Sequence, residues 1–184
     1  IAANLNFSLP AGLSWRLMQQ FIPNMPELSP FAPQVLRWRL WALFTGDEQA
    51  FRQAERTIWR PALHHYLQGG DLAAYQLSGQ LADVFDQYLV YRPDWLAAWQ
   101  SGQLLGLGDD EAWQAALWRQ LAEQTPYVDQ HRVAWWQQLL QALARESNRA
   151  NRLPERYCVF GVTAMAPMYL QLLQALAKHT EVHV

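Results

Sequence analysis

The sequence has 184 residues, is 51% hydrophobic, and carries a formal net charge of -2 from 14 basic and 16 acidic side chains. A chain of this size and composition can fold around one sizeable core, and its apolar runs are far shorter than the roughly 20 residues that a membrane-spanning helix needs. The weak charge argues against binding to nucleic acid through a broad basic field alone.

The single cysteine and the first residues bear on the compartment and on the extent of the chain. Cys158 lies in an apolar stretch, so thiols can build neither a disulfide framework nor a four-cysteine zinc site. We expect a buried, inert thiol in a cytoplasmic protein. The chain opens Ile1-Ala2-Ala3-Asn4, without an initiator methionine. We expect residue 1 to be a cut within a longer protein.

Arginine and tryptophan are unusually frequent. Thirteen arginines stand against one lysine, Lys178, and there are ten tryptophans. A guanidinium stacks on flat rings and forks onto phosphates, and an indole offers a face for stacking. Taken alone, however, this composition favours a simpler explanation, a G+C-rich genome that biases codons toward arginine, alanine and tryptophan.

Helical spacing of apolar residues begins near the start of the chain. It predicts a first helix over residues 11–21, and Pro23, Pro26 and Pro30 then break the chain into a loop. Pro33 suits the first position of a second helix over residues 33–44. That helix is apolar nearly all round, so we expect it to be largely buried or covered by a partner.

The next two predicted helices meet at Gly69-Gly70. A weaker helix covers residues 47–68, interrupted near Pro61, and Asp71 is placed to cap the helix that follows, over residues 71–91. This helix has one apolar stripe and one polar side. The stripe is Leu77, Leu81, Val84, Phe85, Tyr88 and Leu89, and the polar side is Gln76, Gln80, Asp83, Asp86 and Gln87.

Three more helical segments follow. A short helix covers residues 94–100, and a loop over residues 102–108 leads into a helix through Gln124 whose start is charged by Asp109-Asp110-Glu111. A further helix is predicted over residues 129–145, with a polar linker after it. The last thirty residues change character: strands at 157–160 and 181–184 flank a helix over residues 166–179.

These elements predict a mainly α fold with two parts. Residues 1–153 form a mainly helical subdomain, and residues 154–184 form one β-α-β unit. A parallel β-α-β unit needs further strands to make a stable sheet. We therefore interpret the helical block as an insertion into a parallel α/β domain whose other strands lie outside this chain.

Several segments are specific enough to compare with a known family. The longest is Asp83-Val84-Phe85-Asp86-Gln87-Tyr88-Leu89-Val90-Tyr91-Arg92-Pro93-Asp94-Trp95-Leu96. Others are Ile1-Ala2-Ala3-Asn4, Ala112-Trp113-Gln114-Ala115 with Leu117-Trp118, and Tyr169-Leu170-Gln171-Leu172-Leu173-Gln174-Ala175-Leu176 with Lys178-His179. In this order along the chain, they resemble segments of the RecC family, the gamma subunit of bacterial exodeoxyribonuclease V (RecBCD). Residues 26–67 match poorly, and the resemblance there rests on position only.

The resemblance implies a role in the repair of double-strand breaks by homologous recombination. It implies a helical subdomain inserted in a superfamily 1 helicase-like motor domain, of which residues 154–184 are a remnant. It also implies a segment that guides the 3′-ended single strand and scans it for the Chi signal, with RecB and RecD as partner subunits that use ATP and magnesium. Carried over by position, the recognition residues are Leu9, Trp15, Asp83, Val84, Asp86, Gln87, Arg92 and Arg132. At Val84 we expect leucine in the best-known relative, and this departure is either neutral or indicates a somewhat different recognised sequence.

The residue types suit that task. An indole such as Trp15 can stack on a base at roughly 1–3 kcal/mol, and a carboxylate such as Asp83 or Asp86 accepts from base amino groups but repels phosphate. Arg92 and Arg132 can hold phosphates or fork onto guanine. The simpler alternatives are solvated acids, a core indole and an arginine that satisfies helix-end carbonyls. A second hypothesis is a helical scaffold that mainly binds RecB and RecD.

We expect no catalytic residue, metal or cofactor in this chain. The strand that corresponds to Walker B in the resembling motor domain, residues 159–164, lacks the acid with which such a strand holds magnesium, which argues against an ATPase. His64 and His65 are adjacent, so on a helix they point about 100° apart, and we interpret them as surface residues. Ser8, Ser14 and Ser78 lack a nucleophile motif.

Overall fold

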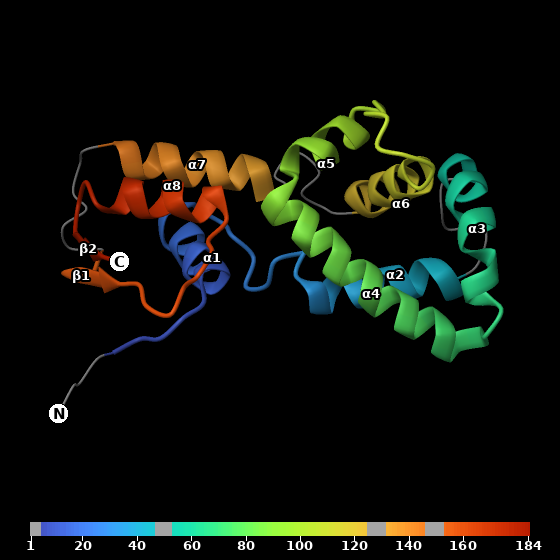
Figure 1. Cartoon of the computed structure of the whole chain (residues 1–184), viewed down its shortest axis with the longest axis horizontal. Helices are drawn as coiled ribbons and strands as arrows, with labels where there is room; N and C mark the ends of the chain where they lie inside the picture. The colour runs from blue at the N-terminus through green and yellow to red at the C-terminus, as the bar shows by residue number, and fades with distance from the viewer. Residues whose placement is uncertain (1–4, 47–52, 125–131, 146–152) are drawn as a thin grey trace. The chain divides into compact units, whose positions relative to one another are not determined.

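The computed structural model describes residues 5–46, 53–124, 132–145 and 153–184. These residues are mainly helical, as predicted, with helices α1 to α8 and strands β1 and β2 (Figure 1). The chain divides into two compact units. Unit 1 comprises residues 1–27 and 133–184, and unit 2 comprises residues 28–132. No helix among the described residues is long and apolar enough to cross a membrane.

Unit 2 is built on the packing of α2 (Pro33–Thr45) against α4 (Gly70–Tyr91). The other helices of the unit are α3 (Gln53–Leu67), α5 (Pro93–Gln100) and α6 (Glu111–Glu123), and α6 packs against both α3 and α5. The core lies where these helices meet. It includes Leu36, Leu40, Leu43, Trp59, Leu81, Phe85, Leu89, Trp99, Leu117 and Trp118.

Polar contacts join the helices of unit 2 beside this core. The guanidinium of Arg39 on α2 donates to the carbonyl oxygens of Leu121 and Pro30, and its burial lowers the pKa of Arg39. Arg119 on α6 makes a two-pronged ion pair with Glu55 on α3, with nitrogen-oxygen distances of 2.7 and 2.8 Å. The α2–α6 and α3–α6 contacts therefore have charged as well as apolar components.

Unit 1 contains a small sheet and three helices, α1 (Pro10–Phe21), α8 (Pro167–Leu176) and α7 (Arg132–Ala144), of which only the first residue, Arg132, belongs to unit 2. Strands β1 (Arg156–Cys158) and β2 (Glu181–His183) pair in parallel, with Tyr157 opposite Val182. Helices α7 and α8 lie side by side and run in the same direction (Figure 1). Trp136 contacts Tyr169 near their starts, and the ring of His179, just after α8, contacts the carbonyl of Leu143 near the end of α7. The predicted β-α-β unit is confirmed, although both strands are shorter than expected.

Three local expectations were wrong. α3 is continuous through Pro61, although proline inside a helix costs roughly 3 kcal/mol. Burial of Trp59 and Leu63 on either side offsets that cost. Asp71 does not cap α4, because the chain enters the helix one residue earlier through Gly70 at a φ of 73°. Asp71 instead lies in the first turn.

Cys158 is also exposed rather than buried. It ends β1, and the side chains at both ends of that short strand face solvent while the middle residue, Tyr157, is half-buried. An apolar sequence context therefore did not predict burial, because the two-stranded sheet covers little of its own surface. Phe160, two residues further on, is likewise 75% exposed.

Helix α2 is only partly buried, so of the two alternatives expected for it, burial and cover by a partner, burial holds for one side of the helix. Leu36, Leu40 and Leu43 have no exposed surface, whereas Trp38 is 58% exposed. The boundaries of α5, α6 and α8 differ from the predicted ones by a few residues at most. Parts of the predicted helices and linker at 47–52, 129–131 and 146–152 lie outside the described residues.

Candidate nucleic-acid interface

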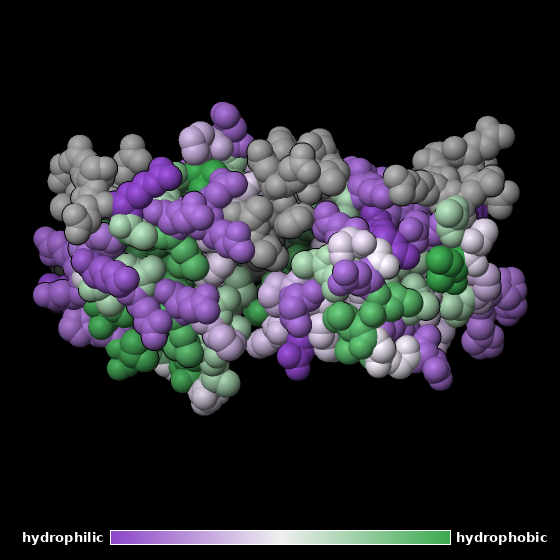
Figure 2. All heavy atoms as spheres, turned by 90° about the horizontal axis from the view of Figure 1, so that it is seen from above, coloured by the Kyte–Doolittle hydropathy of each residue, from purple (hydrophilic) through white to green (hydrophobic). Residues whose placement is uncertain are grey.

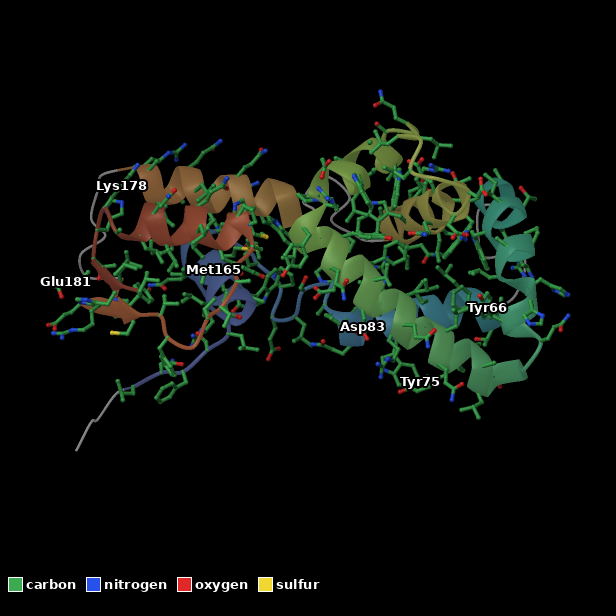
Figure 3. The ribbon with its side chains drawn as sticks, viewed as in Figure 1. Tyr66, Tyr75, Asp83, Met165, Lys178 and Glu181 are labelled. Atoms are coloured by element: carbon green, nitrogen blue, oxygen red, sulfur yellow. The ribbon has the colours of Figure 1, made fainter. Side chains whose placement is uncertain are left out.

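Four of the residues predicted to recognise DNA lie on the C-terminal half of α4. Asp83 and Gln87 are exposed, and Val84 and Asp86 are half-buried. Because each residue of a helix turns by about 100°, Asp83, Asp86 and Gln87 share one side of α4, opposite the fully buried Phe85. Asp83 is labelled in Figure 3. The polar side predicted from the sequence is thus present, and it is oriented by the core on the other side.

The approach of α2 to α4 depends on a glycine. A Cβ atom built on Gly79 would lie 3.0 Å from the terminal nitrogen of Arg37 on α2. The guanidinium carbon of Arg37 lies 5.5 Å from the ring centre of Tyr75, which is one turn before Gly79 on α4. Gly79 therefore leaves space for a cation that covers an aromatic ring. This contact lies one turn before Asp83 on the same helix.

Arg92 occupies the junction between α4 and α5. It follows the last residue of α4 and precedes Pro93, and its backbone N–H donates to the carbonyl of Tyr88. Its guanidinium lies 5.2 Å from the ring centre of Trp95, while the residue as a whole is exposed. Stacking on the indole restricts the guanidinium without removing it from solvent. Arg92 can therefore meet a phosphate or a guanine edge in a largely preset orientation.

Leu9 and Trp15 belong to unit 1. Leu9 is 79% exposed at the start of α1, where its carbonyl accepts from the N–H of Leu13. Trp15 is half-buried, and its indole N–H donates to the carbonyl of Glu27 at 3.2 Å. Its ring also packs edge-on against Trp135, with centroids 5.6 Å apart. Part of the Trp15 ring is thus committed to packing inside its own unit.

Arg132 is the first residue of α7, and its side chain lies outside the described residues. The eight predicted residues are thus divided between the two units, with Leu9 and Trp15 in unit 1 and the other six in unit 2. The structure brings five of them together on or next to α4.

The titratable groups near this face have mainly structural partners. The hydroxyl of Tyr88 donates to Gln114 Oε1 at 2.9 Å, and burial, together with the negative charge of Asp110, raises the pKa of Tyr88.

His64 and His65 are exposed on α3. Within the part of the chain that the structure describes, no group of three or more histidine, cysteine or acidic side chains could hold a metal ion.

Glu111 is a residue whose role the sequence reasoning missed. It was read only as charge at a helix start, but its side chain is buried, with 5% of the residue exposed. Its carboxylate accepts from the indole N–H of Trp99 and from the backbone N–H groups of Leu105, Gly106 and Leu107, at 2.6–2.8 Å. A glycine-rich loop followed at once by an acid was the available signal.

Comparison with known proteins addresses the family of this chain. The family model described as "RecC, N-terminal domain" matches residues 1–184. The chain belongs to the RecC N-terminal domain family. Relatives named "RecBCD enzyme subunit RecC" include those of Escherichia coli K12 and Haemophilus influenzae, 41% and 33% identical over the whole chain. That of Mycobacterium tuberculosis H37Rv is 30% identical over 95% of the chain.

The chain spans about a sixth of these RecC relatives: 16% of the Escherichia coli protein, 18% of the Haemophilus protein and 16% of the Mycobacterium protein. The match covers both compact units and includes residues 26–67, where the resemblance rests on position only. The RecC resemblance drawn from individual segments is therefore confirmed for the chain as a whole.

Proposed function

We propose that this chain is the part of a RecC subunit that guides the 3′-ended single strand and tests it for the Chi signal. The work takes place during unwinding and degradation by a RecBCD complex in double-strand break repair. The observation that carries the proposal is the family match over residues 1–184. The exposed polar side of α4 supports it, because a base reader must present hydrogen-bonding groups to solvent before DNA arrives.

The residue types on this side of unit 2 separate reading from holding. Asp83 and Gln87 can accept from, or donate to, base edges, and the Asp83 carboxylate repels phosphate. Arg92, held over Trp95, supplies the cation that phosphates require. Leu9, directly before α1, and Trp15 on α1 complete the set by family position, with the exposed part of the Trp15 ring as a stacking surface. Val84, Asp86 and Arg132 are included by family position as well.

The proposal extends to the domain context. Residues 1–153 are a helical subdomain inserted in a superfamily 1 helicase-like α/β domain, and residues 154–184 are the part of that domain carried by this chain. The parallel pairing of β1 with β2 supports this assignment, because a two-stranded parallel sheet gains stability when further strands extend it. The partners are RecB, RecD and the 3′-ended strand, in the cytoplasm.

We further propose that the chain catalyses no reaction and holds no cofactor, and that ATP and magnesium act on the partner subunits. Residues 159–164, which follow β1, contain no acid where a motor strand would hold magnesium. The decisive check is nucleotide binding by the intact subunit. Saturable binding of ATP to that subunit alone would contradict this part of the proposal.

The recognition role is tested with Asp83→Ala and Arg92→Ala in the complete three-subunit complex. Both residues are exposed, so the variants should fold normally. We expect unwinding and degradation at near-normal rates on DNA without Chi, and a lost or relaxed response on the same DNA with Chi. Asp71→Ala is the matched control, an exposed acid on α4 outside the recognition set. A normal Chi response in both variants would refute the site assignment.

A second candidate function is a scaffold that mainly binds the RecB and RecD subunits. The observation that favours it is an exposed aromatic cluster on α2 and α4. Trp38 lies 5.9 Å from Trp41 and 5.7 Å from Tyr75 between ring centres, and Trp38 and Tyr75 are 58% and 36% exposed. Aromatic residues beside arginine are enriched at the energetic centres of protein interfaces.

The scaffold function predicts that the aromatic cluster around Trp38 is needed for assembly and that the polar side of α4 around Asp83 is not needed for the Chi response. Trp38→Ser should release a partner subunit from the complex, whereas Asp83→Ala should change nothing. Size-exclusion chromatography of the co-expressed subunits measures the first effect, and Chi-dependent degradation measures the second. Loss of assembly together with a normal Chi response would favour the scaffold over the scanner.

A further inference from the structure

The loop between α5 and α6 presents leucines to solvent in an ordered conformation. Every residue from 101 to 110 is exposed, and Leu104, Leu105 and Leu107 are 55%, 45% and 42% exposed. Three exposed leucines within four residues are unfavourable in free energy, because apolar surface is more stable when it is buried away from water. The core of unit 2 does not cover them.

The buried carboxylate of Glu111 binds the backbone of this loop through hydrogen bonds. Its two carboxylate oxygens accept from the backbone N–H groups of three consecutive residues, Leu105, Gly106 and Leu107, while the indole of Trp99 fixes the carboxylate itself. A charged acceptor makes such bonds shorter and stronger than neutral pairs. The loop backbone is therefore fixed by hydrogen bonds, and packing of the leucines contributes little.

Glycines allow the backbone to follow this path. Gly102, Gly106 and Gly108 have φ values of 85°, 76° and 117°, a region that other residues rarely adopt. At these three positions the backbone turns and has no side chain that could pack inward. The leucines of the loop are exposed. In Figure 1 the loop stands clear of α5 and α6 within unit 2. Figure 2, which looks at this side of the molecule, shows apolar side chains among strongly polar ones.

We propose that residues 104–107 are a preformed docking loop that inserts its leucines into an apolar pocket, rimmed by basic residues, on another protein subunit. This inference rests on the proposed function only in that the chain works inside a multi-subunit assembly. A loop ordered before it is covered loses little conformational entropy on binding, which is what contact with a separately folded partner requires.

The charges around the leucines decide the class of partner. Asp109 and Asp110 follow the loop directly and are exposed, and Asp110 also accepts from the indole N–H of Trp113 at 2.9 Å. Carboxylates repel a phosphate backbone, and leucine has no flat ring on which a base could stack. They suit a protein surface with lysine or arginine at its rim, where opposite charges steer the encounter.

The test uses the full-length protein co-expressed with the other subunits of its assembly. The loop variant carries Leu104→Ser, Leu105→Ser and Leu107→Ser. We expect its affinity for the partner subunit to fall at least tenfold, with an unchanged melting temperature because the replaced side chains are exposed. The matched control carries Leu28→Ser, Ile58→Ser and Tyr66→Ser, which are 60%, 42% and 61% exposed in the same compact unit. The control should assemble normally.

Two further measurements identify the occupant. Asp109→Lys should slow association and weaken its dependence on salt, because a steering charge is reversed. A photoreactive amino acid in place of Leu104 should cross-link to another subunit, at apolar residues next to lysine or arginine. Unchanged affinity of the loop variant, or cross-links that form only within the same chain or to DNA, would overturn the proposal.

The outcome separates this inference from the recognition role. If the loop variant assembles normally, the docking proposal fails whatever Asp83→Ala does to the Chi response. If Asp83→Ala and Arg92→Ala respond normally to Chi while the loop variant loses its partner, the recognition assignment fails and the docking loop stands.

Discussion

The indole nitrogen of Trp99 donates a 2.8 Å hydrogen bond to Oε1 of Glu111, and both side chains are buried in unit 2. Trp99 lies on α5 and Glu111 begins α6, so this bond joins two helices through the residue that also holds the loop between them. One carboxylate therefore links the core of unit 2 to the exposed residues 104–107.

Removal of this carboxylate should loosen the loop before it unfolds the unit. In Glu111→Ala, three backbone N–H groups lose their acceptor, and the melting temperature of the 184-residue chain should fall. Hydrogen exchange at Leu105, Gly106 and Leu107 should accelerate far more than exchange in α4. Glu111→Gln should have an intermediate effect, because an amide oxygen can still accept. Equal acceleration throughout unit 2 would show that the carboxylate supports the fold as a whole.

The stability of the chain should depend on the ionisation of Glu111. Burial by itself would raise the pKa of Glu111, but the hydrogen bonds from Leu105, Leu107, Trp99 and Gly106 lower it below the ordinary value of 4.5. A carboxyl with a lowered folded-state pKa contributes stability above its ordinary pKa, and that contribution is lost as the pH falls through the folded-state value. Denaturant titrations should show a steeper loss below pH 4.5 in the wild type than in Glu111→Gln. Parallel curves would contradict the depressed pKa.

The ion pair between Glu55 and Arg119 should contribute to the α3–α6 contact through its geometry as well as its charge. Both side chains are mostly buried, at 13% and 17% exposed, and Arg119 also donates to the carbonyl of Trp99. Arg119→Lys keeps the charge but loses the two-pronged bond, and we expect a loss of about 2 kcal/mol in the free energy of unfolding. A double-mutant cycle with Glu55→Gln isolates the pair. A coupling energy near zero would assign the loss to packing.

Replacement of Leu40 on α2 should destabilise the fold far more than replacement of Trp38, two residues earlier on the same helix. Leu40 is fully buried, so Leu40→Ala should cost roughly 2–5 kcal/mol of unfolding free energy. Trp38 is exposed, and Trp38→Ala should cost about 1 kcal/mol or less from its lost ring contacts. Chemical denaturation of both variants makes the comparison. A larger loss for Trp38 would mean that its cluster supports the fold and is not held for a partner.

Cys158 should react with a thiol reagent in the folded chain. It is the only cysteine of the chain and is exposed at the end of β1, so one equivalent of reagent should be consumed without denaturant. The same reagent after unfolding gives the total thiol content for comparison. Reaction only after unfolding would indicate that Cys158 is covered in solution.

The helical class, the order of the elements and the polar side of α4 could all be predicted from the amino-acid sequence. Periodicity suffices there, because helix geometry alone places Asp83 and Gln87 opposite Phe85. The family could likewise be read from contiguous segments. Proline, glycine and charge at helix ends were less informative, since their effect depends on what surrounds them. Pro61 lies in a continuous helix and Asp71 does not cap one for this reason.

Which apolar residues are buried, and which acidic residue has a structural role, depends on contacts between segments. Leu40 and Trp38 share one apolar helix, yet the packing of α4 buries one and leaves the other exposed. The sequence predicts Glu111 to be helix-start charge, whereas in the structure its buried carboxylate accepts hydrogen bonds from Trp99 and the loop backbone. Burial and hydrogen bonding arise between segments distant in sequence or through turns that glycine permits, and no local pattern specifies those contacts.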